Sequence, residues 1–181
     1  MFTNPGVIGF LVAIIIVVIF LYNRFVVLRQ RVNNAWSQID VNLKRRFDLI
    51  PNLVETVKAY ASHEEGVFTE IVAARNIVNA AGSKAEIAEA EGELTNTLKH
   101  LFAVAESYPN LKANENFLSL QKELAETENK IMFSRQFYND TVQKYNTKIE
   151  LFPNNILAKI LKFSKADYFD FVEGSVQFEK K

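Results

Sequence analysis

The sequence contains no cysteine and little of what catalytic loops are usually built from. Of its 181 residues, two are histidine and six are glycine. Without cysteine the chain can have no disulfide, no thiol nucleophile and no cysteine-ligated metal. No glycine-rich phosphate loop, nucleophile elbow or HExxH motif occurs. We therefore expect helical scaffolding rather than an enzyme, and no cofactor.

A net charge is also missing, because 21 basic residues are balanced by 21 acidic ones. A neutral chain produces no strong field that would attract nucleic acid or an acidic substrate. We therefore expect no nucleic-acid partner. The length predicts a single domain behind one membrane segment.

What the sequence does contain is an uncharged apolar run of 17 residues, 6–22. That length is at the short end of what crosses an apolar core about 30 Å thick. A cleaved signal peptide is the alternative, but no Lys or Arg precedes the run and no small-x-small cleavage site follows it. Residues 1–22 are thus predicted to form an uncleaved anchor. Three basic residues, Arg24, Arg29 and Arg31, follow this run. The positive-inside rule therefore predicts a single-pass protein with its N-terminus outside and its domain in the cytoplasm.

Beyond the anchor, apolar residues recur every three or four positions, as on one face of a helix. In the first helix these are Trp36, Ile39, Leu43, Phe47 and Ile50. Pro51 should end that helix and turn the chain, because proline lacks a backbone N–H and disfavours helical angles in the residue before it. We predict an all-α fold, in which a single transmembrane helix continues into an antiparallel, coiled-coil-like four-helix bundle over residues 23–152.

The remaining helices have recognisable ends. The second is expected from Pro51 to Ala80, and the third from Ser83, where Glu86 completes a capping box, to Pro109. The fourth, capped by Asn114 and running to Leu151, has the clearest four-three pattern. Its members are Phe117, Gln121, Leu124, Glu128, Ile131, Arg135, Tyr138, Val142, Tyr145, Ile149 and Phe152.

Four charged residues occupy positions of these apolar seams: Glu64, Glu91, Glu128 and Arg135. Unpaired buried charge is costly, so two interpretations remain open. Either some of them meet inside the bundle, with Arg135 pairing a glutamate from another helix and setting the register, or they lie at the edge of the seam in water.

Two other charged features have ordinary explanations. No metal is expected, because neither histidine supplies the Glu-x-x-His pattern of a di-iron bundle. The tract Lys44, Arg45 and Arg46 could bind phosphate, but a helix-dipole role or an ion pair with Asp40 or Asp48 is favoured.

The C-terminal part begins with a short basic amphipathic helix over residues 153–166. Ile156, Leu157, Ile160 and Leu161 fall on one side of it, and the lysines fall on others: Lys159, Lys162 and Lys165. It could lie on an anionic membrane surface through these lysines, or it could be a lid on the bundle. The tail, residues 167–181, is expected to be a docked aromatic strap or to be frayed.

Several segments together resemble one known family. They are Y-N-R-F-V-V-L-R from Tyr22, W-S-Q-I-D-V-N-L-K-R-R-F-D-L-I-P-N-L-V from Trp36, V-K-A-Y-A-S-H-E from Val57, A-E-S-Y-P-N-L-K-A-N-E-N-F from Ala105 and Y-N-D-T-V-Q-K-Y-N from Tyr138. In this order they are similar to the LemA family, over about Tyr22 to Phe163. The resemblance implies a single-pass bacterial membrane protein with a helical domain.

Two functions are compatible with this reading. The first is a non-enzymatic scaffold that self-associates at the inner membrane or organises it, with membrane lipids and further copies of the chain as partners. A magnetosome-associated branch of the LemA family adds weight to it. The second is an adaptor for a membrane protease or an envelope quality-control system, which the family's frequent gene neighbourhood with membrane metalloproteases implies.

Overall fold

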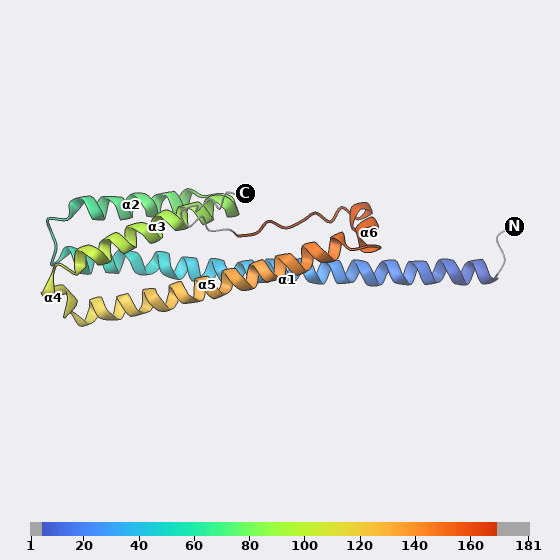
Figure 1. Cartoon of the computed structure of the whole chain (residues 1–181), viewed down its shortest axis with the longest axis horizontal. Coiled ribbons are helices and arrows are strands. Elements are labelled where there is room, and N and C mark those ends of the chain that lie inside the picture. Colours follow the sequence, from blue (N-terminus) through green and yellow to red (C-terminus); the bar gives the residue numbers. More distant parts are fainter. Residues whose placement is uncertain (1–4, 170–181) are drawn as a thin grey trace, which may run out of the picture. The chain divides into compact units, whose positions relative to one another are not determined.

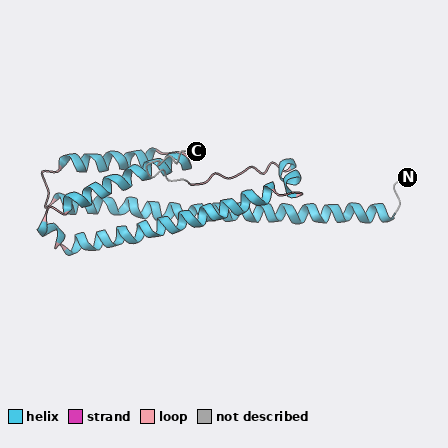
Figure 2. Cartoon of the chain, viewed as in Figure 1, coloured by secondary structure: helices cyan, strands magenta, loops and turns pink. Residues whose placement is uncertain are grey.

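The computed structural model describes residues 5–169, and within that range it contains helices and no strand (Figures 1 and 2). The helices are α1 (Pro5–Lys58), α2 (Glu65–Ala80), α3 (Lys84–Ala105), α4 (Pro109–Lys112), α5 (Glu115–Glu150) and α6 (Asn154–Ile160). The predicted all-α fold with one long apolar N-terminal helix is confirmed. Of the predicted anchor and tail, residues 1–4 and 170–181 lie outside the described range.

The first part of α1 is exposed although its residues are apolar. Between residues 6 and 22 only Val18 and Leu21 are partly covered by other side chains. α1 is the one helix among the described residues that is long and apolar enough to cross a membrane. A helix that is apolar on every side is typical of a segment surrounded by lipid or by protein, and within residues 5–169 no other segment covers most of this part of α1.

The chain divides into two compact units, and α1 and α5 each contribute to both. Among the described residues, the first unit comprises 5–39 and 134–168, and the second comprises 40–133 and Phe169. Each has its own interior.

In the second unit, apolar side chains of α1, α2, α3, α4 and α5 form one core. Helices α2 and α3 run antiparallel, since Glu70 near the middle of α2 contacts His100 of α3, at 3.1 Å, and Glu64 before α2 contacts Tyr108 after α3, at 3.0 Å. Burying one such apolar side chain contributes about 1.5 to 3 kcal/mol. The core consists mainly of Ile50, Leu53, Val57, Val67, Phe68, Ile71, Ala74, Leu94, Leu98, Leu101, Ala105, Leu111, Phe117 and Leu124.

In the first unit, α1 and α5 run antiparallel to each other with one apolar face each. The Trp36 ring of α1 meets the Tyr138 ring of α5 edge-on, with centroids 5.6 Å apart. In this unit, the buried apolar residues of these two helices are Phe25, Val32, Ala35 and Ile39 of α1, and Tyr138, Val142, Tyr145 and Ile149 of α5. The apolar positions predicted for the fourth helix are therefore buried from Phe117 to Ile149, and Phe152 is exposed instead.

Local capping signals were predicted correctly. Ser83 Oγ accepts a hydrogen bond from the Glu86 N–H, and the Glu86 carboxylate accepts from the Ser83 N–H. The Gly82 and Ser83 N–H groups lower the pKa of Glu86 below its ordinary value. Asn114 Oδ1 accepts from the Phe117 N–H at 3.0 Å and caps α5. Each cap satisfies a donor that a helix start would otherwise leave unpaired.

The prediction of a turn at Pro51 is wrong. Pro51 lies inside α1, which ends at Lys58, and α2 begins only at Glu65. A proline within a helix costs about 3 kcal/mol because one backbone hydrogen bond is lost and the ring crowds the preceding turn. Here Ile50, Leu53 and Val57 flank it on the buried face, each at most 1% exposed, and their burial offsets that cost.

The predicted end of the third helix also differs, since α3 stops at Ala105 and Pro109 begins the single turn of α4. Proline is well suited to a first helical position, where its missing N–H would have no partner.

Candidate functional site

The most unusual side chain of the second unit is Arg46 of α1, which is 2% exposed. Its guanidinium pairs with the Glu91 carboxylate of α3 and lies 2.6 Å from Glu128 Oε2 of α5. It also donates to Thr95 Oγ1 at 3.0 Å and to the Glu91 carbonyl oxygen at 3.3 Å. A single arginine thus joins three helices of this unit.

The cluster joins opposite charges in the interior of the second unit. Glu91 is buried with Arg46, whereas the Glu128 side chain is half exposed. A buried charge is tolerated when an opposite charge and hydrogen bonds surround it, as they do here. We propose that this pair sets the register of the three helices, because its side chains meet only when the helices are aligned in this way.

The structure places the four predicted seam residues differently from one another. Glu91 and Glu128 do meet through a basic residue, but that residue is Arg46 rather than Arg135. Arg135 is partly buried on α5 in the first unit. Glu64 directly precedes α2 and accepts a hydrogen bond from the Tyr108 hydroxyl at 3.0 Å, which raises the pKa of that tyrosine.

Within the basic tract 44–46, the interpretation of Arg46 was therefore wrong. We expected a helix-dipole role or an ion pair with Asp40 or Asp48, yet Arg46 lies in the interior and pairs with residues far along the chain. Arg45 forms a half-exposed pair with Glu123, 3.6 Å away. Position 46 is three residues after Leu43 and four before Ile50, both buried. That spacing is the signal that could have identified it.

In the first unit, α6 has an unexpected orientation. Asn154 and Ala158 are buried, whereas Ile156 and Ile160 are 55% and 69% exposed. Asn154 Nδ2 donates to the Lys148 carbonyl oxygen at 3.1 Å. The four apolar residues predicted to share one side are thus divided, since Leu157 and Leu161 are only half-buried.

The three lysines predicted to contact a membrane are all exposed in the first unit. Lys159 lies on α6, and Lys162 follows it with a positive φ of 57°. Lys165 forms an exposed ion pair with Glu150 at the end of α5. Lys159 and Lys162 are therefore the better placed of the three to meet an external anion.

The segment after α6, residues 162–168, is fastened to α5 by neutral hydrogen bonds. Tyr138 and Tyr145 donate from their hydroxyls to the carbonyl oxygens of Asp167 and Ser164, both at 2.8 Å. The Asn146 amide bonds both the N–H and the carbonyl of Ala166, at 2.9 Å each. Burial raises the pKa of Tyr145, so the hydroxyl remains a donor.

The same segment also reaches α1. The Phe163 ring lies edge-on to Phe25 and Tyr22, with centroids 5.3 and 6.0 Å apart. The Arg29 guanidinium lies over the Phe163 ring, 5.3 Å from its centroid. Buried tyrosine hydroxyls and a buried asparagine amide need partners, so Tyr138, Tyr145 and Asn146 on the seam were a readable signal that another segment docks there.

Two further kinds of site were considered within the described range. No group of three or more His, Cys, Asp and Glu side chains between residues 5 and 169 is placed to hold a metal ion. His100 Nδ1 approaches Glu70 Oε2 at 3.1 Å, but both side chains are more than half exposed. This pair is an ordinary surface contact.

Residues 5–169 thus define a helical protein with one helix long and apolar enough to cross a membrane. Its residues 35–180 match the model of the LemA family, and the chain belongs to that family.

Its relatives include magnetosome proteins. MamQ 1 and MamQ 2 of Paramagnetospirillum magneticum (strain AMB-1) are each 28% identical to it, over 87% of this chain and 68% of theirs. MamQ of Magnetospirillum gryphiswaldense is 24% identical over 88% of this chain and 68% of its own. Protein LemA of Metamycoplasma hominis is 25% identical over 74% and 61%. None of these names gives an enzyme activity.

Proposed function

We propose that this chain is a non-enzymatic scaffold, anchored in the cell membrane by α1, which self-associates and so organises the bilayer around it. The observation that carries the proposal is the continuity of α1. One helix of 54 residues begins with an apolar run and ends with side chains buried in the core of the second unit. A helix satisfies its own backbone hydrogen bonds, so it can pass from lipid to protein without a break.

Self-association is supported by apolar side chains that the single chain leaves uncovered on α5. Phe133 and Phe137 are 63% and 54% exposed, and they are four residues apart, so they share one face of the helix. Neighbouring Met132 is 53% exposed. Exposed aromatic clusters are typical of surfaces that meet another protein, and a second copy of this chain is the partner that a scaffold requires.

The orientation follows from charge. Arg24, Arg29 and Arg31 come after the apolar run, which favours a cytoplasmic location for the units behind it. A single cysteine introduced at an exposed position such as Val41 reports on this, because a membrane-impermeant maleimide should label it only after the cells are opened. Labelling in intact cells would reverse the proposed orientation.

The decisive experiment is chemical crosslinking and size analysis of the full-length chain in mild detergent and in liposomes. We expect dimers or larger species, and we expect Phe133→Ser with Phe137→Ser to reduce them strongly. Val41→Ser is the matched control, since Val41 is 67% exposed but lies on α1.

Two outcomes would overturn the proposal. One is a strictly monomeric chain in both detergent and lipid. The other is affinity capture from native membranes that recovers a protease in stoichiometric amount and no second copy, which would indicate the adaptor role instead.

A further inference from the structure

Helix α6 turns its most apolar side chains away from the protein. A helix that merely closes the end of a bundle buries its large apolar residues. Here Ile156 and Ile160 face outward, and the small Ala158 and the polar Asn154 face inward. Just before the helix, Phe152 is 80% exposed. In water this arrangement is unfavourable, so the outward face of α6 needs an apolar environment.

The position of α6 shows where that environment is. Phe163, three residues after the end of α6, packs against Tyr22 and Phe25 of α1. Tyr22 is the last residue of the apolar run. Figure 1 shows α6 beside α1 in this unit, further toward the N-terminal end than the segment that follows it. Helix α6 is therefore held at the level where the apolar run ends.

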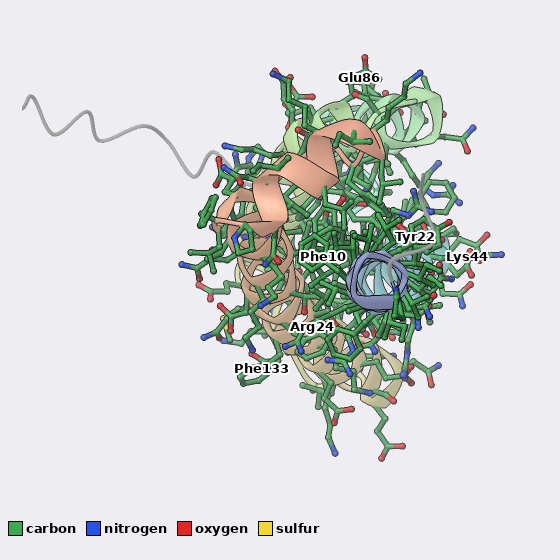
Figure 3. All side chains as sticks on the ribbon, turned by 90° about the vertical axis from the view of Figure 1, so that its right-hand side faces the viewer. Phe10, Tyr22, Arg24, Lys44, Glu86 and Phe133 are labelled. Atoms are coloured by element: carbon green, nitrogen blue, oxygen red, sulfur yellow. The ribbon has the colours of Figure 1, made fainter. Side chains whose placement is uncertain are left out.

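The direction of α6 fits a surface rather than a span. In Figure 3, viewed from the N-terminal end, α1 is seen end-on and the salmon ribbon of α6 is seen from its side. Within this unit α6 thus lies across α1. If α1 crosses a bilayer, α6 lies along the surface of that bilayer, as interfacial helices do.

The charge around α6 selects the kind of surface. Residues 148–167 contain four lysines against one glutamate and one aspartate. Glu150 is paired with Lys165, which leaves Lys159 and Lys162 exposed beside the outward isoleucines. Lysines next to an exposed apolar face match the anionic head groups and the acyl boundary of a bilayer.

From these observations we propose that α6 is a second membrane contact, which lies in the interface of an anionic bilayer beside the anchor. Phe152, Ile156 and Ile160 enter the boundary between head groups and acyl chains, about 5 to 10 Å deep for helices of this kind. Lys159 and Lys162 contact the lipid phosphates. The inference rests on the membrane anchorage of α1 but not on self-association, so either can fail without the other.

The test uses the full-length chain, which contains no cysteine, so Ile160→Cys adds a unique thiol. The thiol is labelled with the environment-sensitive fluorophore NBD, and the protein is reconstituted in phosphatidylcholine vesicles with and without phosphatidylglycerol. Brominated lipids then report contact by quenching. The matched control is Val41→Cys, an exposed position on α1 19 residues beyond Tyr22, which corresponds to about 28 Å along the helix.

We expect a several-fold greater loss of fluorescence at position 160 than at position 41, and the largest loss in anionic vesicles. Lys159→Glu with Lys162→Glu should reduce quenching at position 160 in anionic vesicles only. Lys122→Glu with Lys130→Glu, two exposed lysines of α5, should leave it unchanged. Far-UV circular dichroism confirms that each variant keeps its helices.

Equal quenching at positions 160 and 41 in both vesicle types would overturn the proposal. Stronger quenching at position 160 that depends on neither phosphatidylglycerol nor the lysines would overturn the electrostatic part and leave an apolar contact alone.

Discussion

The two halves of α1 have the same secondary structure and opposite surfaces. In the first half, residues 6–22 are apolar on all sides and almost all exposed. In the second half one apolar stripe is buried, at Val32, Ala35, Ile39, Leu43, Ile50, Leu53 and Val57. A helix in lipid needs no particular face, whereas a helix against protein needs a stripe. The distribution of apolar residues around the helix, rather than the helix itself, therefore indicates which environment suits each half.

The largest effect on stability is expected at Arg46, the charged residue on the buried stripe of the second half. Arg46→Leu leaves the Glu91 carboxylate buried without its partner, and we expect a loss of about 3 to 5 kcal/mol of unfolding free energy. Replacing both Arg46 and Glu91 by Leu should restore most of it, because the uncompensated charge is then gone. Denaturant titration of the full chain in mild detergent, followed by circular dichroism, measures both.

The control for Arg46 is its neighbour. Arg45→Leu removes only a half-exposed pair with Glu123 and should cost less than about 1 kcal/mol. An equal effect of the two single substitutions would show that the buried pair is not what distinguishes position 46.

The next largest effect compares equivalent deletions in the two halves. Leu53→Ala removes a fully buried side chain and should lower the unfolding free energy by about 3 kcal/mol. Ile16→Ala, at a position 61% exposed, should leave that free energy unchanged. The same titration checks both, and a comparable loss from Ile16→Ala would mean that the first half packs against protein.

A smaller effect is expected at Pro51, inside the second half. Pro51→Ala restores a backbone N–H and removes the crowding of the proline ring, and the greater freedom of the unfolded chain offsets part of that gain. We expect a net rise of about 1 kcal/mol in unfolding free energy. A decrease would indicate that the proline ring itself contributes to packing.

The smallest effect lies outside α1, at the cap of α3. The Gly82 and Ser83 N–H groups keep the pKa of Glu86 below its ordinary value of 4.5. The carboxylate therefore stabilises the fold above that pH, and its contribution is lost as the pH falls through the lowered pKa. Glu86→Gln should lower the melting temperature slightly at pH 7, and this difference should shrink as the pH falls below 4.5. A difference that persists in acid would rule out this ionisation as its cause.

Local signals predicted much of the fold. The caps at Ser83 and Asn114 depend on residues within three positions, so the sequence contains the whole interaction. The turn at Pro51 was wrong because the preference of proline is local, whereas the burial that overrides it comes from helices distant in sequence. The buried residues Ile39, Leu43, Arg46, Ile50, Leu53 and Val57 keep a four-three spacing on both sides of Pro51. That spacing indicates both the unbroken helix and the buried arginine.

Less of the candidate site than of the fold could be predicted from the sequence. The lysines of α6 were identified by composition, but which isoleucines face outward depends on how Tyr138, Tyr145 and Asn146 fasten the following segment. Those bonds join α5 to backbone atoms about 20 to 30 residues away, and hydrogen bonds to backbone atoms leave no side-chain pattern at the acceptor.

If α1 spans a bilayer as we propose, its short apolar run has a consequence for the thickness of that bilayer. Seventeen helical residues reach about 26 Å, less than the roughly 30 Å of an average hydrocarbon core. Tilting of α1 would shorten its span across the bilayer further, and a second membrane contact at α6 would resist tilting. We therefore expect the membrane to thin around the protein, or the protein to concentrate where lipids have shorter tails.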